Sequence, residues 1–298
     1  MDIAIKILLI VLIVFALILG LAIGLSEETT SNSPSPGPSP GPSPGPSSST
    51  NNLWVAVGQD TGADQENVLY SEDGKTWQIS SGISFSNFGR GVAHGTSNGT
   101  SSLWVAVGSD STAQENILFS EDGKTWQVSS GISFFTQGNG VAYGTSNGTE
   151  PLWVAVGTDA SLAVVKKNIL YSEDGKTWQL SSSYFSSNGN GVAYGTSNGT
   201  DPLWVAVGQG TTAQENILYS EDGKTWQVSS GVNFSFNGNG VAYGTSSDGT
   251  TPLWVATGYD TAVDQENILF SEDGKTWQVS SGISFSGIGY GVAHGTTV

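Results

Sequence analysis

Carboxylates dominate the side chains of this sequence that could take part in chemistry. The 298 residues include 26 Asp and Glu, nine Lys and Arg, two His and no Cys. Two carboxylates at a suitable separation can hydrolyse a glycosidic bond if one of them has a raised pKa. Without cysteine no thiolate metal site is available, and the widely separated His94 and His294 do not favour a histidine-built zinc site. A net charge of −17 repels nucleic-acid phosphates, so we expect no nucleic-acid partner.

Five of the aspartates share one context, the seven-residue segment SEDGKTW. They are Asp73, Asp122, Asp174, Asp222 and Asp273. Because the five contexts are identical, we interpret these aspartates as structural residues that cap a turn. The GVAHG and GVAYG runs, which would line a central tunnel, carry no carboxylate. We therefore expect no enzymatic activity, and a glycoside hydrolase that uses individual acids such as Asp60 or Asp264 is the alternative.

Aromatic and polar side chains gather in two loops of each repeat, and these residue types suit a binding site. Aromatic rings stack on sugar rings, while carboxylates and amides hydrogen-bond to sugar hydroxyls. The candidate ligand-binding residues are Phe85, Phe88, Arg90, Phe134, Phe135, Tyr184, Phe185, Phe234, Phe236, Phe285 and Tyr290, together with Asp60, Glu66, Glu115, Glu215, Asp260 and Glu266. The alternative is that the aromatic residues fill gaps between repeats. The third repeat reads AVVKKN from Ala163, where the others end in Gln-Glu-Asn, so we expect its site to be altered.

Calcium is the metal that acidic loops could attract. Asp60 with Asp64, and Asp260 with Asp264, lie close together in sequence. These pairs lack the dense, regular spacing of oxygen ligands found in calcium-binding loops. We therefore predict no metal and no cofactor.

The elements that position these residues are repeats of about 50 residues. The string LWVA begins at Leu53, Leu103, Leu152, Leu203 and Leu253. Each repeat contains four strand-like runs, for example 140–144, 152–157, 168–172 and 177–182, with Asn-Gly and Asp-Gly hairpin signals between them. Four antiparallel strands at this period are typical of propeller blades. The sequence therefore predicts an all-β fold in which residues 53–298 form a five-bladed β-propeller; a solenoid is the alternative.

The two ends of the repeat array complement each other. The first repeat begins at its second strand, Leu53, and the chain ends with an unpaired first strand, Gly291 to Gly295. We predict that this C-terminal strand completes the first blade and closes a monomeric ring, which removes an exposed sheet edge.

The SEDGKTW segment reads as a hairpin turn that ends in a large packing residue. Its Asp-Gly pair favours the turn, its Ser can add a side-chain bond, and its Trp (Trp77, Trp126, Trp178, Trp226 and Trp277) provides apolar surface. The segment resembles the Asp-box motif of the BNR-repeat propellers found in sialidases and extracellular binding proteins, although it is one residue shorter between Asp and Thr. The resemblance implies a turn between the third and fourth strands, away from the active face. Sialidases use an arginine cluster, and Arg90 is the only arginine here, so we expect no sialidase activity.

The N-terminal region has the composition of a membrane anchor and a stalk. Ile7 to Leu25 is uninterrupted in apolar residues and glycine, and as a helix it would be about 28 Å long, enough to cross a bilayer. We predict an anchor over residues 1–25 with a cytoplasmic N-terminus, and a disordered Ser/Pro/Gly-rich linker over 26–52. A cleaved signal peptide, which would make the protein secreted, is the alternative.

Four sequons fit an extracellular or lumenal location. Asn98, Asn147, Asn198 and Asn233 are candidate glycosylation sites, although Asn-Gly-Thr is also good turn chemistry. The combined interpretation is a membrane-anchored module that recognises glycans or another surface ligand, such as a protein, through the loop-rich face of the propeller. A surface or coat protein without a specific ligand is the alternative.

Overall fold

The computed structural model describes residues 52–62, 66–111, 115–161, 163, 165–212, 215–261 and 267–295. Within these ranges the chain forms 22 strands and no α-helix, which confirms the all-β prediction. Accordingly, no helix of the described part is long and apolar enough to cross a membrane. The predicted anchor, and the linker up to residue 51, lie outside the described residues.

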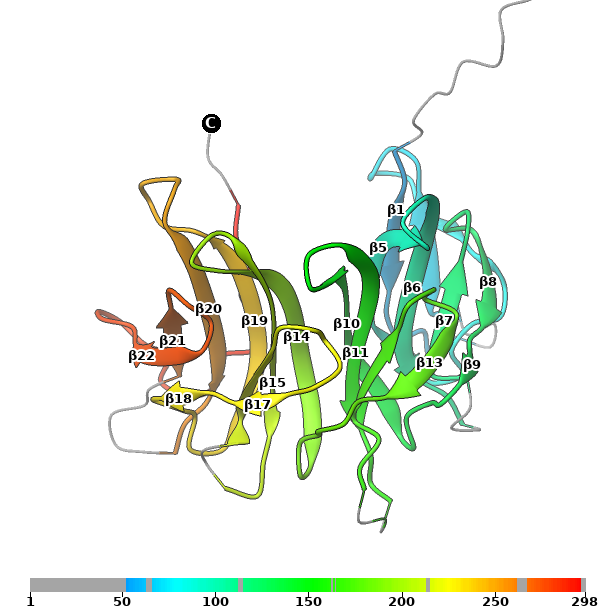
Figure 1. Cartoon of the computed structure of the whole chain (residues 1–298). Coiled ribbons are helices and arrows are strands. Elements are labelled where there is room, and N and C mark those ends of the chain that lie inside the picture. Colours follow the sequence, from blue (N-terminus) through cyan, green and yellow to red (C-terminus); the bar gives the residue numbers. More distant parts are fainter. Residues whose placement is uncertain are drawn as a thin grey trace, which may run out of the picture. The chain divides into compact units, whose positions relative to one another are not determined.

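Repeats 2 to 5 each contain four consecutive strands that pair antiparallel in chain order (Figure 1). Repeat 2 comprises β5 (Phe88–Ser97), β6 (Ser101–Ser109), β7 (Ile117–Ser120) and β8 (Thr125–Val128); repeat 3 comprises β10 (Gln137–Ser146), β11 (Glu150–Thr158), β12 (Ile169–Ser172) and β13 (Thr177–Leu180). Repeat 4 comprises β14 (Asn188–Ser197), β15 (Asp201–Gln209), β16 (Ile217–Ser220) and β17 (Gln227–Val228); repeat 5 comprises β19 (Asn237–Thr245), β20 (Pro252–Tyr259), β21 (Ile268–Ser271) and β22 (Thr276–Val279). Repeat 1 has three strands, β1 (Trp54–Val57), β2 (Val68–Ser71) and β3 (Gln78–Ile79).

The turn between the first and second strands follows from its Asn-Gly pair. Asn98, Asn147 and Asn198 adopt φ of 53°, 51° and 53°, and the glycine after each also has positive φ. Two consecutive residues with positive φ make a turn whose twist matches that of the flanking strands, which is why Asn-Gly is favoured there. These three hairpins are confirmed.

Neighbouring repeats are joined by short parallel ladders. The residues after the fourth strand form β4 (Ser81–Gly82), β9 (Ser130–Gly131) and β18 (Ser230–Gly231), which pair with β8, β13 and β22 of the next repeat. At these three junctions each repeat therefore extends the edge of the following one.

First strands of successive repeats also lie against each other. The Tyr194 ring packs on Gly144, where a methyl group would meet its Cγ at 2.3 Å, and its hydroxyl bonds the Thr145 hydroxyl at 2.5 Å. Asn139 Nδ2 donates to the Gly189 carbonyl at 2.8 Å. The same contacts recur at the next junction, which explains why the strand sequences are nearly identical.

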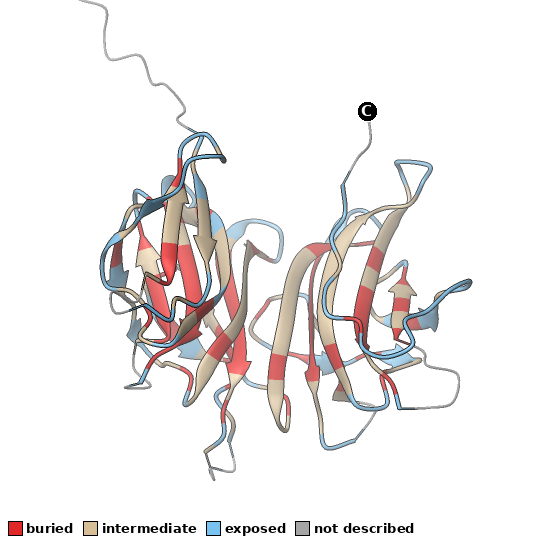
Figure 2. Cartoon of the chain, turned by 180° about the vertical axis from the view of Figure 1, so that it is seen from behind, coloured by how far each residue is buried: buried red, intermediate tan, exposed pale blue. Residues whose placement is uncertain are grey.

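The core lies between the sheets of successive repeats. One cluster combines Leu103, Val105 and Phe134 with Trp153 and Trp178, so residues of repeats 2 and 3 share one core. Figure 2 shows the buried residues along the middle strands of the sheets. The LWVAV strands of repeats 2 to 5 are thus largely covered on both faces, whereas β1 of repeat 1 is not, since Trp54 is 58% exposed.

The two ends of the array differ from its interior. In the described residues β1 pairs only with β2, and Gly291 to Gly295 belong to no ladder. The C-terminal residues instead lie against β19, since Asn239 Nδ2 donates to the Gly289 carbonyl at 2.8 Å and the His294 ring packs on Gly244. They therefore occupy the place of a first strand that follows repeat 5. The sequence predicts that this C-terminal segment pairs with repeat 1. Among the described residues there is no ladder between the segment and β1.

Candidate functional site

The five SEDGKTW turns use their aspartates internally. Asp174 Oδ1 accepts hydrogen bonds from the Ser172 hydroxyl at 2.9 Å and from the Lys176 and Thr177 N–H groups at 2.8 and 2.7 Å. In the first turn, the N–H groups of Thr76 and Lys75, with the Ser71 hydroxyl, lower the pKa of Asp73 to about 2. A general acid needs a raised pKa, so these carboxylates serve the turn, which agrees with the structural role predicted for them.

Lysines of these turns link neighbouring repeats. Lys176 Nζ lies 2.5 Å from Glu121 Oε1 of the preceding repeat and 5.3 Å from the centre of the Phe119 ring. Equivalent pairs join Lys124 to Glu72, Lys224 to Glu173 and Lys275 to Glu221. The tryptophans that end the turns (Trp126, Trp178, Trp226 and Trp277) are buried, whereas Trp77 of the first repeat is 42% exposed. The turns thus contribute contacts that stabilise the junctions between neighbouring repeats.

Four of the predicted ligand-binding aromatics belong to the core. Phe85, Phe134, Phe185 and Phe234 are at most 1% exposed, because each packs beneath the loop against its own and the neighbouring repeat. They cannot contact a ligand, so for them the gap-filling alternative is correct. Phe135, Phe236, Phe285 and Tyr290 are exposed, while Phe88 and Tyr184 are half-buried.

An asparagine that sequence reasoning missed holds the two loops of each repeat together. Asn116 Nδ2 donates to the Phe134 carbonyl at 2.7 Å, and Asn67, Asn168, Asn216 and Asn267 make the same bond to Phe85, Phe185, Phe234 and Phe285. Its signal was visible, because an asparagine precedes the third strand in all five repeats. The two loops of each repeat therefore lie side by side.

The predicted acidic loop residues are only partly described, and they too have structural partners. Asp60 Oδ1 accepts from the Gly62 N–H at 2.8 Å and Oδ2 from the Glu66 N–H at 3.2 Å, so it caps its own loop. The buried Asp260 accepts from the Ser235 hydroxyl. Asp64, Asp264 and Glu266 lie outside the described residues. Among the residues described, no three His, Cys, Asp or Glu side chains lie together as a metal site.

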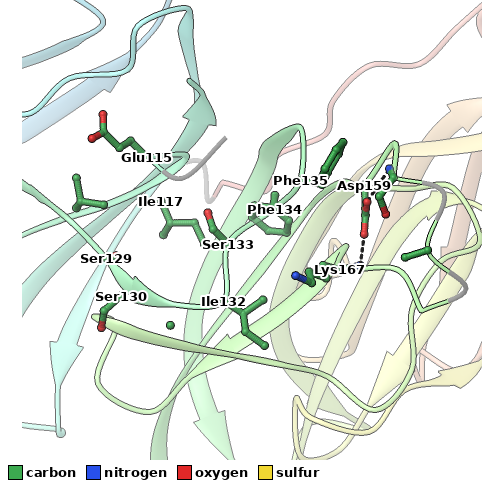
Figure 3. A pocket seen from close by; sticks show the side chains of 14 residues that line it. Glu115, Ile117, Ser129, Ser130, Ile132, Ser133, Phe134, Phe135, Asp159 and Lys167 are labelled. Carbon is green, nitrogen blue, oxygen red and sulfur yellow. Dashed lines mark hydrogen bonds between the residues drawn. The ribbon is translucent and has the colours of Figure 1, made fainter. Parts of the chain in front are cut away.

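A pocket of about 890 Å³ opens between repeats 2 and 3 (Figure 3), and we call it the inter-repeat pocket. It is lined by Ser129 to Phe135 together with Glu115, Asp159 and Lys167. Phe135 is 56% exposed, and the buried Ser129 hydroxyl has no protein partner in the described part of the chain. The pocket thus combines an exposed ring with hydroxyl, carboxylate and ammonium groups.

Asp159 is fixed in this pocket by its own loop. Its Oδ1 accepts from the Ser161 N–H at 2.8 Å and its Oδ2 from the Lys167 N–H at 2.6 Å. Burial alone would raise its pKa, but hydrogen bonds from the Ser161 hydroxyl and from these N–H groups outweigh burial and leave the pKa lowered. The carboxylate stays ionised and is a poor proton donor, and with 3% exposure it serves its own loop.

A second pocket, of about 540 Å³, lies where the first strands begin, and we call it the amide pocket. Its lining comprises Arg90, Gln137, Asn139, Thr158, Asn188, Asn190, Gln209, Phe236, Asn237, Asn239 and Tyr290. It therefore brings together three predicted site residues, Arg90, Phe236 and Tyr290, that are far apart in the sequence. Seven of the other eight residues are asparagine or glutamine from repeats 3 to 5, and the prediction did not include them.

The predicted glycosylation residues in the hairpin turns are accessible. Asn98, Asn147 and Asn198 are exposed, whereas Asn233 is half-buried.

No family model and no curated protein matches this chain. Among solved structures it is similar to a protein of unknown function from Dyadobacter fermentans, with 19% identity and a TM-score of 0.38 over 68% of this chain and 66% of the other. It is also similar to the GH74 xyloglucanase of Xanthomonas campestris, with 13% identity and a TM-score of 0.36 over 77% of this chain and 39% of that one. For the GH74 enzyme of Niastella koreensis the values are 12% and 0.26, over 72% and 41%. The chain thus spans about two fifths of the length of the two GH74 enzymes.

Proposed function

We propose that this protein is a binding module that recognises glycans, or another surface ligand, through the loops between its repeats. The observation that carries this proposal is the inter-repeat pocket, in which the exposed Phe135 ring lies beside hydroxyl and carboxylate groups. A ring with neighbouring hydrogen-bonding groups suits the flat apolar face and the hydroxyls of a sugar. The lowered pKa of Asp159 makes this residue unsuited to the general-acid role that a glycosidase requires of one carboxyl group.

The test is a glycan-array screen of the intact chain in mild detergent, followed by product analysis on every ligand found. The matched variants are Phe135→Ala and Ile79→Ala, because both side chains are 56% exposed but only Phe135 lines the pocket. We expect Phe135→Ala to weaken binding about 2- to 13-fold, the equivalent of an aromatic contact, and Ile79→Ala to leave it unchanged. Released product would indicate a hydrolase instead, and folded protein that binds no glycan would overturn glycan recognition and leave a protein ligand or a coat role.

We further propose that residues 53–298 form a closed five-bladed propeller of the Asp-box type. Two kinds of junction recur from repeat to repeat, and each leaves one unpaired member at either end of the array. Thr177 of repeat 3 pairs with Ser130 of repeat 2. The equivalent positions at the two ends of the array are Thr76 in repeat 1 and Ser281 in repeat 5. Likewise, Lys75 of repeat 1 and Glu272 of repeat 5 are equivalent to Lys176 and Glu121, which form an ion pair.

A cysteine pair tests this closure, since the chain has no cysteine of its own. Adjacent strands lie about 4.8 Å apart, within the span of a disulfide. The double variant Thr76→Cys/Ser281→Cys should therefore oxidise within one molecule, as should the control Thr177→Cys/Ser130→Cys. If only the control forms an intramolecular bond, or if the test pair links two molecules, the ends do not meet within the chain.

The proposed location is the cell or virion surface, with residues 1–25 as the anchor and the repeats on the extracellular or lumenal side. The apolar run from Ile7 to Leu25 and the exposed sequons at Asn98, Asn147 and Asn198 support it. If glycosidase digestion shifts the electrophoretic mobility of the protein, the repeats lie on the extracellular or lumenal side. A membrane-bound chain without glycans would contradict this location.

A further inference from the structure

The amide pocket contains the only arginine of the protein, and no carboxylate lines it. The chain as a whole carries 26 acidic residues and a net charge of −17. Arg90 is exposed, and within the described part of the chain its guanidinium forms no ion pair, since all four pairs there use lysines. An exposed arginine outside these ion pairs is a group that can attract an anion even in so acidic a protein.

Arg90 is held in position by an aromatic neighbour. Its Cζ lies 4.7 Å from the centre of the Phe88 ring, a cation–π arrangement that supports one face of the guanidinium. The edge of the guanidinium keeps its N–H donors for a partner.

The position of Arg90 in its repeat shows that the fold does not require an arginine there. The equivalent residues of repeats 3, 4 and 5 are Asn139, Asn190 and Asn239, and each donates to a carbonyl of the following first strand at 2.8 Å. At the last equivalent position the chain has Tyr290, which is 78% exposed. The two residues that depart from this asparagine series both line the amide pocket.

The remaining groups of the pocket match the other parts of a sugar. Gln137, Asn188 and Asn237 offer amide donors and acceptors suited to hydroxyl groups, and Phe236 and Tyr290 offer rings. A planar guanidinium pairs with a carboxylate through two parallel hydrogen bonds. A volume of about 540 Å³ is in the range of small-ligand sites.

We propose that the amide pocket binds a carboxylated sugar, of which a hexuronic acid is the simplest form, with Arg90 holding the carboxylate. This site is separate from the inter-repeat pocket and does not depend on the function proposed for it.

The experiment is isothermal titration of the intact chain in mild detergent with glucuronate, glucose and inorganic phosphate at fixed ionic strength. We expect glucuronate to bind more tightly than either of the other two. Arg90→Gln should weaken glucuronate binding about tenfold or more, the loss of a charge-assisted contact, and Arg90→Lys should recover only part of it because the paired geometry is lost. Lys124→Gln is the matched control, since it removes the same charge from a SEDGKTW turn.

The following outcomes would overturn the proposal. If Arg90→Gln binds glucuronate as the wild type does, or if Lys124→Gln weakens binding equally, Arg90 does not hold the carboxylate. If phosphate binds as tightly as glucuronate, the pocket selects anions and not a carboxylated sugar. Phe135→Ala should leave glucuronate binding intact, so the failure of the inter-repeat site can be distinguished from the failure of this one.

Discussion

Replacing Trp54 by alanine measures whether the first and last repeats pack against each other. Trp204 and Trp254, at the same place in repeats 4 and 5, are 0% exposed, and their Nε1 atoms donate to Thr145 and Thr196 carbonyls of the preceding repeat at 2.9 and 3.0 Å. Trp54 is 58% exposed, because no repeat precedes it in the chain. In a closed ring repeat 5 would cover Trp54, and Thr245 would supply the carbonyl.

The size of the effect follows from the burial of the two side chains. Removing a fully buried tryptophan costs about 3–5 kcal/mol, so Trp204→Ala should lower the melting temperature by about 6–20 °C in a domain of this size. In a closed ring Trp54→Ala should lower it by the same amount. In an open array Trp54 stays 58% exposed, so the decrease in melting temperature would be about two fifths as large, or roughly 3–8 °C.

The assay is thermal unfolding of the wild type and both variants, followed by tryptophan fluorescence or circular dichroism. Equal losses for Trp54→Ala and Trp204→Ala agree with closure. A loss for Trp54→Ala below half of that for Trp204→Ala would refute it, because the side chain would then be as exposed as in the open array.

Three further predictions concern the turns and the junctions. The hydrogen bonds that lower the pKa of Asp73 to about 2 stabilise the fold fully above pH about 4 and are lost as the pH falls towards 2, so Asp73→Asn should show a smaller drop in melting temperature over that range than the wild type. Gly144→Ala should cost about 1–3 kcal/mol, because its methyl group would overlap the Tyr194 ring; unchanged denaturant unfolding would contradict this contact. Lys176→Gln should change the free energy of unfolding by less than about 1 kcal/mol, because its pair with Glu121 is largely exposed, and a larger loss in urea titrations would show that this pair is stronger than its exposure indicates.

The repeat length, the strands and their hairpins could be predicted because their signals are local. Asn147-Gly148 specifies its turn through positive φ at both residues, whatever the rest of the chain does. The aromatic loops were predicted less well. Phe134 and Phe135 are adjacent and identical in type, yet one is buried and the other is 56% exposed. Which of the two rings is buried depends on how the neighbouring repeat packs. The residue pattern within the loop does not indicate it.

The amide pocket illustrates the same limit for the site. Arg90, Phe236 and Tyr290 were each predicted as ligand-binding residues, but their common pocket depends on how the first strands are placed across several repeats. A comparison of equivalent positions would have shown that Arg90 and Tyr290 replace asparagine. It would not have shown that both line one pocket, since strand placement is a tertiary property.

The hydrogen bonds of the SEDGKTW turn have a consequence for the order in which the chain folds. In the third repeat, the partners of Asp174 Oδ1 lie only two or three residues away, whereas the pair of Lys176 and Glu121 joins positions 55 residues apart. Closing the longer loop costs roughly 3 kcal/mol more in chain entropy. During synthesis, each repeat can therefore form the hairpin of its third and fourth strands soon after these residues leave the ribosome. The contacts between repeats must wait until about 50 further residues have been translated.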